Sequence, residues 1–214
     1  MKSLFTPEMR AQLAASRAIA TVTVENVEDA KPLAEALLAG GIKAVEITMR
    51  TPVALRVMQV IAENYSEMLV MAGTVITPTQ VRQVQDAGAI CAVAPGMNAR
   101  VVQAAVDAQL PFAPGIATPS EIEQALEFDC DILKLFPAEP MGGLKYLKNM
   151  QAPYAHLGLQ FIPLGGLTAE NAEDYLQEDI ILAVGGSWIA SASAILAGDW
   201  AGITQRAAAA MQQS

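Results

Sequence analysis

Short runs of apolar residues alternate along the chain with stretches of helical periodicity. The runs are rich in Val and Ile, and eight of them qualify as strands: Ile19–Val24, Ala44–Thr48, Leu69–Ala72, Ile90–Val93, Pro111–Ala113, Ile132–Leu135, Leu159–Pro163 and Ile180–Val184. Between them, apolar residues recur at helical spacing, as at Leu33, Ala36 and Leu37 before the glycine stop at Gly40. The pattern predicts strands and helices in regular alternation.

Helix starts are marked by a threonine followed by a proline. The pair occurs at Thr51–Pro52, Thr77–Pro78 and Thr118–Pro119, and each predicts an N-cap with proline at the first helical position. Weaker caps are expected at three further polar residues, Asn98, Thr168 and Ser187.

The alternation favours an α/β fold in which parallel strands are buried on both faces. Eight strand–helix units can close into a ring, so we expect a single (β/α)8 TIM barrel domain over residues 1–214. Residues 1–16 are expected to form an extra N-terminal helix that covers the floor of the barrel. No linker or low-complexity tract divides the chain, and no N-terminal glycine-rich dinucleotide motif is present.

Composition and charge narrow the possible partners. The 214 residues are 53% hydrophobic and 16% charged, which excludes a disordered chain. The net charge of −9 argues against nucleic acid or an anionic membrane as the main partner. Glu8 and Arg10 interrupt any secretory signal, and the uncharged stretch 180–198 is expected to be strand, glycine turn and buried helix. We therefore expect a soluble, cytoplasmic protein.

The cysteine and histidine content limits the chemistry. Cys91 and Cys130 lie far apart in apolar runs and are expected to be buried free thiols of a reducing compartment. A single histidine, His156, excludes a multi-histidine metal site and disfavours a Ser-His-Asp or Cys-His catalytic set. We expect His156 to be a surface residue.

Two charged residues stand inside apolar strand runs. Lys134 lies in Ile132–Leu135 and Glu46 lies in Ala44–Thr48, each near the carboxyl end of its predicted strand. Removal from water favours the neutral amine, the form that acts as a nucleophile, and a nearby carboxylate can move protons for it. The pair favours Schiff-base chemistry; the structural alternative is an ion pair at the barrel rim.

Other polar residues and glycines follow the predicted strand ends. Arg50 and Thr74 could together hold a carboxylate, although Arg50 alone could be a solvated rim residue and Thr74 a helix cap. Two glycine pairs, Gly165–Gly166 and Gly185–Gly186 with Ser187, end the last two strands. Loops at these positions form the phosphate site of many such barrels, so we expect a phosphate there.

Five segments in order along the chain carry a family resemblance: Gly40–Thr51, Ala72–Val75, Asp131–Glu139, Pro163–Gly166 and Gly185–Trp188. They resemble the 2-keto-3-deoxy-6-phosphogluconate (KDPG) aldolase family, whose members often also cleave 4-hydroxy-2-oxoglutarate. The resemblance implies a class I aldolase, a homotrimer that acts on small 2-keto acids without metal or organic cofactor. It makes Lys134 the Schiff-base lysine and Glu46 the acid/base.

The resemblance also implies the substrate-binding residues. Arg50 and Thr74 would hold the pyruvate carboxylate, Phe136 would line the substrate site, and Gly165, Gly166, Gly185, Gly186 and Ser187 would form the phosphate site.

One position departs from the family, which commonly has threonine where this chain has Leu164. A hydroxyl that could bond the substrate is gone, so we expect weaker discrimination between the phosphorylated sugar acid and 4-hydroxy-2-oxoglutarate. Two other classes stay open: a phosphate-binding barrel enzyme of the sugar-phosphate epimerase type, and a non-catalytic ligand-binding barrel.

Overall fold

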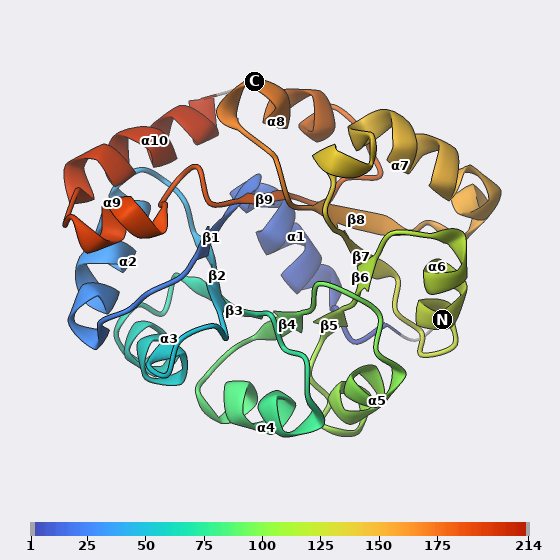
Figure 1. Cartoon of the computed structure of the whole chain (residues 1–214), viewed down its shortest axis with the longest axis horizontal. Coiled ribbons are helices and arrows are strands. Elements are labelled where there is room, and N and C mark those ends of the chain that lie inside the picture. The colour runs from blue at the N-terminus through green and yellow to red at the C-terminus, as the bar shows by residue number, and fades with distance from the viewer. Residues whose placement is uncertain (1–2, 213–214) are drawn as a thin grey trace.

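Parallel strands and helices alternate along most of the chain (Figure 1). The computed structural model describes residues 3–212. The strands are β1 (Ala18–Val22), β2 (Ala44–Thr48), β3 (Leu69–Gly73), β4 (Cys91–Val93), β5 (Phe112–Ala113), β6 (Gly115–Ile116), β7 (Ile132–Leu135), β8 (Gln160–Pro163) and β9 (Val184–Gly186).

In Figure 1 the first helix lies near the centre, behind the strands, and the other helices surround the strands. They are α1 (Pro7–Ser16), α2 (Ala30–Ala39), α3 (Ala54–Asn64), α4 (Pro78–Asp86), α5 (Ala99–Asp107), α6 (Pro119–Leu126), α7 (Gly143–Gln151), α8 (Ala169–Leu176), α9 (Ala192–Leu196) and α10 (Trp200–Gln212). Short 3₁₀ turns are η1 (Val27–Asp29), η2 (Glu139–Met141) and η3 (Ala152–Leu157).

The strands pair in two parallel sheets. One has six strands in the order β5-β4-β3-β2-β1-β9, and the other has three in the order β6-β7-β8. Backbone hydrogen bonds continue beyond these pairs: Lys134 N donates to Pro114 O, between β5 and β6, and Leu182 N donates to Phe161 O of β8, each at 2.9 Å. The predicted α/β class with parallel strands is confirmed.

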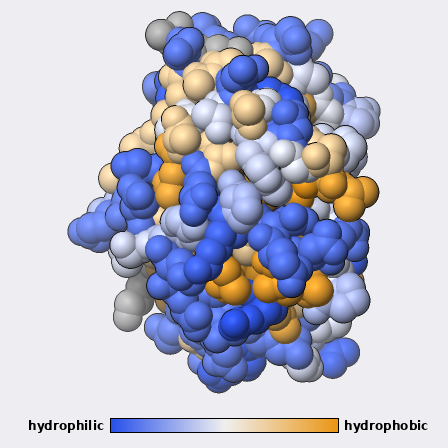
Figure 2. Space-filling view, turned by 90° about the vertical axis from the view of Figure 1, so that its left-hand side faces the viewer, coloured by the Kyte–Doolittle hydropathy of each residue, from blue (hydrophilic) through white to orange (hydrophobic). Residues whose placement is uncertain are grey.

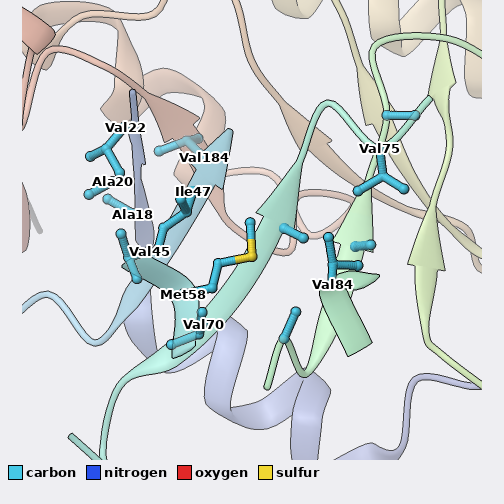
Figure 3. Packing of buried hydrophobic residues seen from close by; sticks show 14 of the residues in the cluster. Ala18, Ala20, Val22, Val45, Ile47, Met58, Val70, Val75, Val84 and Val184 are labelled. Atoms are coloured by element: carbon cyan, nitrogen blue, oxygen red, sulfur yellow. The ribbon is translucent and has the colours of Figure 1, made fainter. Parts of the chain in front are cut away.

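Side chains leave the strands in two directions and form two apolar clusters. Outward-facing residues of β1, β2, β3 and β9 pack against the helices, as Figure 3 shows for Val45, Ile47 and Val70 with Met58 of α3. Residues of the opposite parity, such as Ile19, Met71 and Ile132, form a separate inner cluster. Alternation along a strand explains the division, because successive side chains point to opposite faces.

The N-terminal helix α1 covers one end of the inner cluster. Leu13 of α1 and Phe5 before it are buried there, and Met9 packs against it. Arg10 of the same helix forms an ion pair of 2.6 Å with Asp131, at the start of β7, and donates a 2.9 Å hydrogen bond to Gln160 of β8. The helix predicted over residues 1–16 corresponds to α1, which begins at Pro7 and covers the amino ends of the strands. Residues 1–2 lie outside the described part of the chain.

Most predicted strands agree with the structure to within two residues at each end, and the fifth and the eighth differ in ways that matter for the fold. The fifth, Pro111–Ala113, corresponds to β5 alone, and a second short strand, β6, follows after Pro114, which has no N–H to donate to a ladder. The eighth, Ile180–Val184, begins only at Val184, and Ile181 makes an isolated bridge to Phe161. The strand pairing therefore extends to the Gly185–Gly186 segment, which had been expected to follow the strand.

Helix capping follows the threonine–proline pattern at two of its three sites. Thr77 and Thr118 cap α4 and α6 in capping boxes, and Asn98 and Thr168 cap α5 and α8. The expected cap at Thr51 is wrong, because its hydroxyl donates a 2.7 Å hydrogen bond to Val24 O and α3 begins at Ala54.

The expected cap at Ser187 is also wrong. Helix α9 begins at Ala192, and the hydroxyl of Ser191 accepts a hydrogen bond from the backbone N–H of Ala194. Ser187 thus lies in a loop before the helix, where its side chain is exposed and available for other contacts.

The surface is largely hydrophilic on the face that carries α2, α9 and α10, with hydrophobic residues in small groups (Figure 2). Within residues 3–212, the large hydrophobic side chains that are exposed are Ile76 and Leu196. No helix in this part of the chain is long and apolar enough to span a bilayer.

Removing the Arg10 guanidinium should loosen the α1 cover. We expect Arg10→Met to lower the free energy of unfolding by about 2–3 kcal/mol, because it leaves the partly buried Asp131 carboxylate without its charged donor. Urea denaturation followed by circular dichroism measures the change. Lys148→Met, which removes a more exposed ion pair with Glu178, is the control and should change stability by less than about 1 kcal/mol. Equal effects of the two substitutions would contradict the role given to Arg10.

Candidate active site

A buried ion pair lies at the centre of the molecule. Lys134 of β7 and Glu46 of β2 both point inward, and Lys134 Nζ is 3.1 Å from Glu46 Oε1. Lys134 is only 4% exposed and Glu46 only 1% exposed. Among residues 3–212 the buried polar residues are Ser16, Glu46, Thr48 and Lys134. The two charged residues singled out in the sequence are thus brought into direct contact.

Several groups compensate for the removal of these charges from water. Lys134 Nζ also lies 3.5 Å from Glu46 Oε2, and Thr21 Oγ1 of β1 donates to the same oxygen at 3.4 Å. The ring of Phe136 lies 5.5 Å from Lys134 Nζ, within the range of a cation–π contact. A buried ion pair is stable only when its remaining polar atoms also have partners, and these contacts provide such partners.

Glu46 has room only because residue 73 is glycine. Glu46 and Gly73 lie on adjacent strands, and a Cβ built on Gly73 would come within 2.1 Å of Glu46 Oε1. Any side chain at position 73 would displace the carboxylate from Lys134. The sequence showed Gly73 only as part of a strand end, since its role depends on the direction of a side chain on the neighbouring strand.

Cys91 of β4 belongs to the inner cluster near the pair. Burial raises the pKa of its thiol far above the usual range, and the negative charge of Glu46 raises this pKa further. Burial likewise raises the pKa of Cys130 to about 12. Both cysteines are buried free thiols, as predicted. They stay protonated at neutral pH, so neither is a reactive thiolate.

Arg50 and Thr74 are brought together at the carboxyl ends of β2 and β3. Arg50 Nε donates a 3.3 Å hydrogen bond to Thr74 Oγ1. Thr74 has φ of +59°, a left-handed conformation that is uncommon for a β-branched residue and that clusters at functional sites. The guanidinium is exposed, so it can meet a charged ligand at the opening.

The glycine loops after β8 and at β9 are close to the same opening. Gly165 and Gly166 have φ of +94° and +83°, where glycine is favoured. Gly185 is covered by Leu164, since a Cβ on Gly185 would lie 2.5 Å from Leu164 Cγ, and it does not line the opening. Leu164 itself is buried in the inner cluster while reaching the opening.

One cavity of about 360 Å³ joins these elements. Its walls contain Lys134, Phe136, Arg50, Gly165, Gly166, Gly186 and Ser187 among the predicted residues, together with Leu164. Glu46 and Thr74 do not line the cavity. Glu46 accepts a hydrogen bond from Lys134, and Thr74 accepts one from Arg50, so each contacts a residue that does. The predicted residues therefore converge on one site, with Gly185 beneath it.

Three threonines of the site were missed by sequence reasoning. Thr21, Thr23 and Thr48 line the cavity, and Thr23 Oγ1 is 2.9 Å from Thr48 Oγ1. Strand alternation was the signal that could have found them, because every second side chain points to the same face. Thr21 and Thr23 alternate with the same phase as inward-facing Ile19, and Thr48 with the same phase as Glu46. The sole histidine, His156, is exposed in η3, as expected.

Comparison with known proteins agrees with this geometry. The family described as KDPG and KHG aldolase matches residues 9–206. The chain belongs to this aldolase family. The 2-dehydro-3-deoxy-phosphogluconate aldolase of Treponema pallidum (strain Nichols) is 44% identical over 88% of this chain and 89% of its own. The KHG/KDPG aldolase of Escherichia coli (strain K12) is 38% identical over 91% and 90%.

A solved aldolase of the family has the same fold. The KDPG aldolase of Legionella pneumophila, with pyruvate captured as a covalent carbinolamine intermediate, superposes with a TM-score of 0.88 at 38% identity, over 94% of this chain and 96% of that one. Membership of the KDPG and KHG aldolase family, inferred from five sequence segments, is thereby confirmed.

Removing one charge of the buried pair should lower the stability of the protein. We expect Lys134→Met to lower the free energy of unfolding by about 3–5 kcal/mol, because it leaves the Glu46 carboxylate buried without a cation. The double variant Lys134→Met/Glu46→Met removes both charges and should recover most of the loss. Urea denaturation of the wild type and both variants measures this. A double variant as unstable as the single one would show that packing, rather than the unpaired charge, causes the loss.

Proposed function

We propose that this protein is a class I aldolase that cleaves 2-keto-3-deoxy-6-phosphogluconate to pyruvate and glyceraldehyde 3-phosphate, and 4-hydroxy-2-oxoglutarate to pyruvate and glyoxylate. The observation that carries the proposal is the buried contact of 3.1 Å between Lys134 Nζ and Glu46 Oε1 beside a cavity of about 360 Å³. The names of its relatives support the same activity.

The reaction begins with a neutral amine. The proton of Lys134 Nζ passes to Glu46 along their hydrogen bond, and Nζ attacks the C2 ketone of the substrate. The carbinolamine loses water, for which Glu46 returns the proton, and an iminium ion forms. Because Glu46 touches Nζ directly, the same carboxylate can give and take protons at each of these steps.

The iminium then serves as the electron sink for bond cleavage. Glu46, through water, takes the proton of the C4 hydroxyl; the C3–C4 electron pair moves into the iminium; and the aldehyde product leaves. The resulting enamine is protonated at C3, and hydrolysis of the new iminium releases pyruvate and free Lys134. Every proton that Glu46 accepts is returned within the cycle, so the residues need no external base.

The remaining site residues hold the substrate in this proposal. Arg50, fixed by its bond to Thr74, binds the carboxylate next to the ketone. Phe136 packs beside Lys134, and Gly165, Gly166, Gly186 and Ser187 bind the phosphate, with Gly185 giving Leu164 the space it occupies. Leu164 offers no hydrogen bond, so discrimination between the two substrates is weaker than with threonine there.

The proposal extends to the whole molecule. The hydrogen bonds between β5–β6 and β7, and between β8 and the segment before β9, support one closed (β/α)8 barrel. The chain is then a single domain over residues 1–214, with α1 as its floor. We propose a cytoplasmic homotrimer that acts on small 2-keto acids, uses no metal or organic cofactor, and binds neither nucleic acid nor membrane.

Trapping with borohydride tests the covalent step. Wild-type protein incubated with pyruvate and sodium borohydride should gain the mass of one reduced pyruvate adduct, located by peptide mass spectrometry on Lys134. Lys134→Ala should lose both the adduct and cleavage activity, whereas Lys145→Ala, which changes an exposed lysine, should keep both. An epimerase or a non-catalytic binding protein would give no adduct in the wild type.

Exchange of the pyruvate methyl protons tests Glu46. In deuterium oxide, proton NMR should show exchange slowed by about 10²- to 10⁴-fold in Glu46→Gln, because the amide cannot carry the proton. Glu63→Gln, on the exposed side of α3, should exchange like the wild type. Wild-type exchange in Glu46→Gln would remove Glu46 from the mechanism.

A further inference from the structure

The wall of the cavity formed by β1 and the residue just after it (the β1 wall) carries two hydroxyl groups that the mechanism does not use. Thr21 and Thr23 lie two residues apart on the same face of the chain, and both line the cavity with Thr48 of the adjacent strand. A hydroxyl has one proton to donate and two lone pairs to accept. What this wall can offer a ligand depends on where the protons of these hydroxyls point.

The hydrogen bonds fix the direction of each proton. Thr48 Oγ1 lies 3.0 Å from Val22 O, a carbonyl that can only accept, so the Thr48 proton points there. In the arrangement that makes both hydrogen bonds, Thr23 is the donor of the 2.9 Å contact between Thr23 Oγ1 and Thr48 Oγ1. Thr21 likewise donates toward the Glu46 carboxylate. Both hydroxyls of the β1 wall thus have their protons engaged by protein groups.

The lone pairs of Thr23 remain available. Within residues 3–212 no protein group donates a hydrogen bond to Thr23 Oγ1. The charged residues that line the cavity, Lys134 and Arg50, are both cations. The cavity is therefore polarised, with donors that suit the anionic ends of a substrate and, on the β1 wall, an acceptor that would repel an anion.

We propose that Thr23 is a specificity-determining residue, whose oxygen accepts a hydrogen bond from a hydroxyl on the aldehyde half of the substrate. Thr48 is the positioning residue that holds the Thr23 proton away from the ligand. The proposal rests on the aldolase function above. It assigns to this chain a preference for aldehydes with a hydroxyl next to the carbonyl. Leu164, also on the cavity wall, has no polar atom with which to supply such a contact.

The test is the addition of pyruvate to paired aldehydes. We compare kcat/KM for glyceraldehyde 3-phosphate with that for its 2-deoxy analogue, which lacks the hydroxyl but keeps the phosphate. The wild type should prefer the hydroxylated aldehyde by about two- to twelvefold, the range for one neutral hydrogen bond. Thr23→Val has nearly the same shape and should bring the ratio close to one, while Thr23→Ser should keep it.

Two further variants separate hydrogen-bond direction from packing. Thr204→Val removes a hydroxyl on α10 that donates to backbone carbonyls away from the site, and its ratio should equal that of the wild type. Thr48→Val frees the Thr23 proton, so Thr23 can also donate. A 2-fluoro analogue of the aldehyde has an acceptor but no proton to donate. In Thr48→Val, kcat/KM for this analogue should therefore rise relative to kcat/KM for the hydroxylated aldehyde.

The outcomes distinguish the proposal from the function on which it rests. Failure of the wild type to form the borohydride adduct would overturn the aldolase function, and the assignment of Thr23 with it. With the adduct formed, a wild-type ratio near one, or an unchanged ratio in Thr23→Val, would overturn the role of Thr23 alone. If Thr23→Val does not fold, the ratio in Thr23→Ala together with that in Thr23→Ser decides the question in the same way.

Discussion

The ion pair between Glu46 and Lys134 is the interaction on which the rest of the structure depends. Two charges in an apolar interior are stable only if each is partnered and neither is crowded. Gly73 leaves the space that Glu46 occupies, Thr21 donates to its second oxygen, and the ring of Phe136 lies beside Lys134. These residues come from four segments of the chain, so the fold as a whole holds the pair together.

The division of the strand residues into two clusters allows the protein to contain a buried charged site and remain stable. Outward-facing side chains pack against the helices and supply most of the buried apolar surface. The inner cluster is smaller, and Phe5 and Leu13 close it at the amino ends of the strands. The buried polar residues Glu46, Thr48 and Lys134 have the same inward parity and lie in β2 and β7. Stability and chemistry therefore depend on different faces of the same strands.

The sequence was informative where a residue contradicted its surroundings. Lys134 and Glu46 were predictable because a charge inside an apolar strand run is anomalous, and the alternation of runs predicted the parallel α/β fold. Thr21 and Thr23 were not, because threonine is common in strands and only the side-chain contacts distinguish these two. Thr51 was misassigned because a nearby carbonyl, Val24 O, competes for the hydroxyl that a helix cap would use. The role of Gly73 depends on the neighbouring strand that carries Glu46, which no local pattern contains.

The attachment of α1 has a consequence for the order of events during synthesis. Arg10 binds Asp131 and Gln160, which follow it by 121 and 150 residues. The helix therefore leaves the ribosome long before the residues that anchor it, and loop closure over such distances comes late in folding. Until then the inner cluster is open at its amino end, with Phe5 and Leu13 unburied. The first helix of the chain is thus among the last to reach its final place.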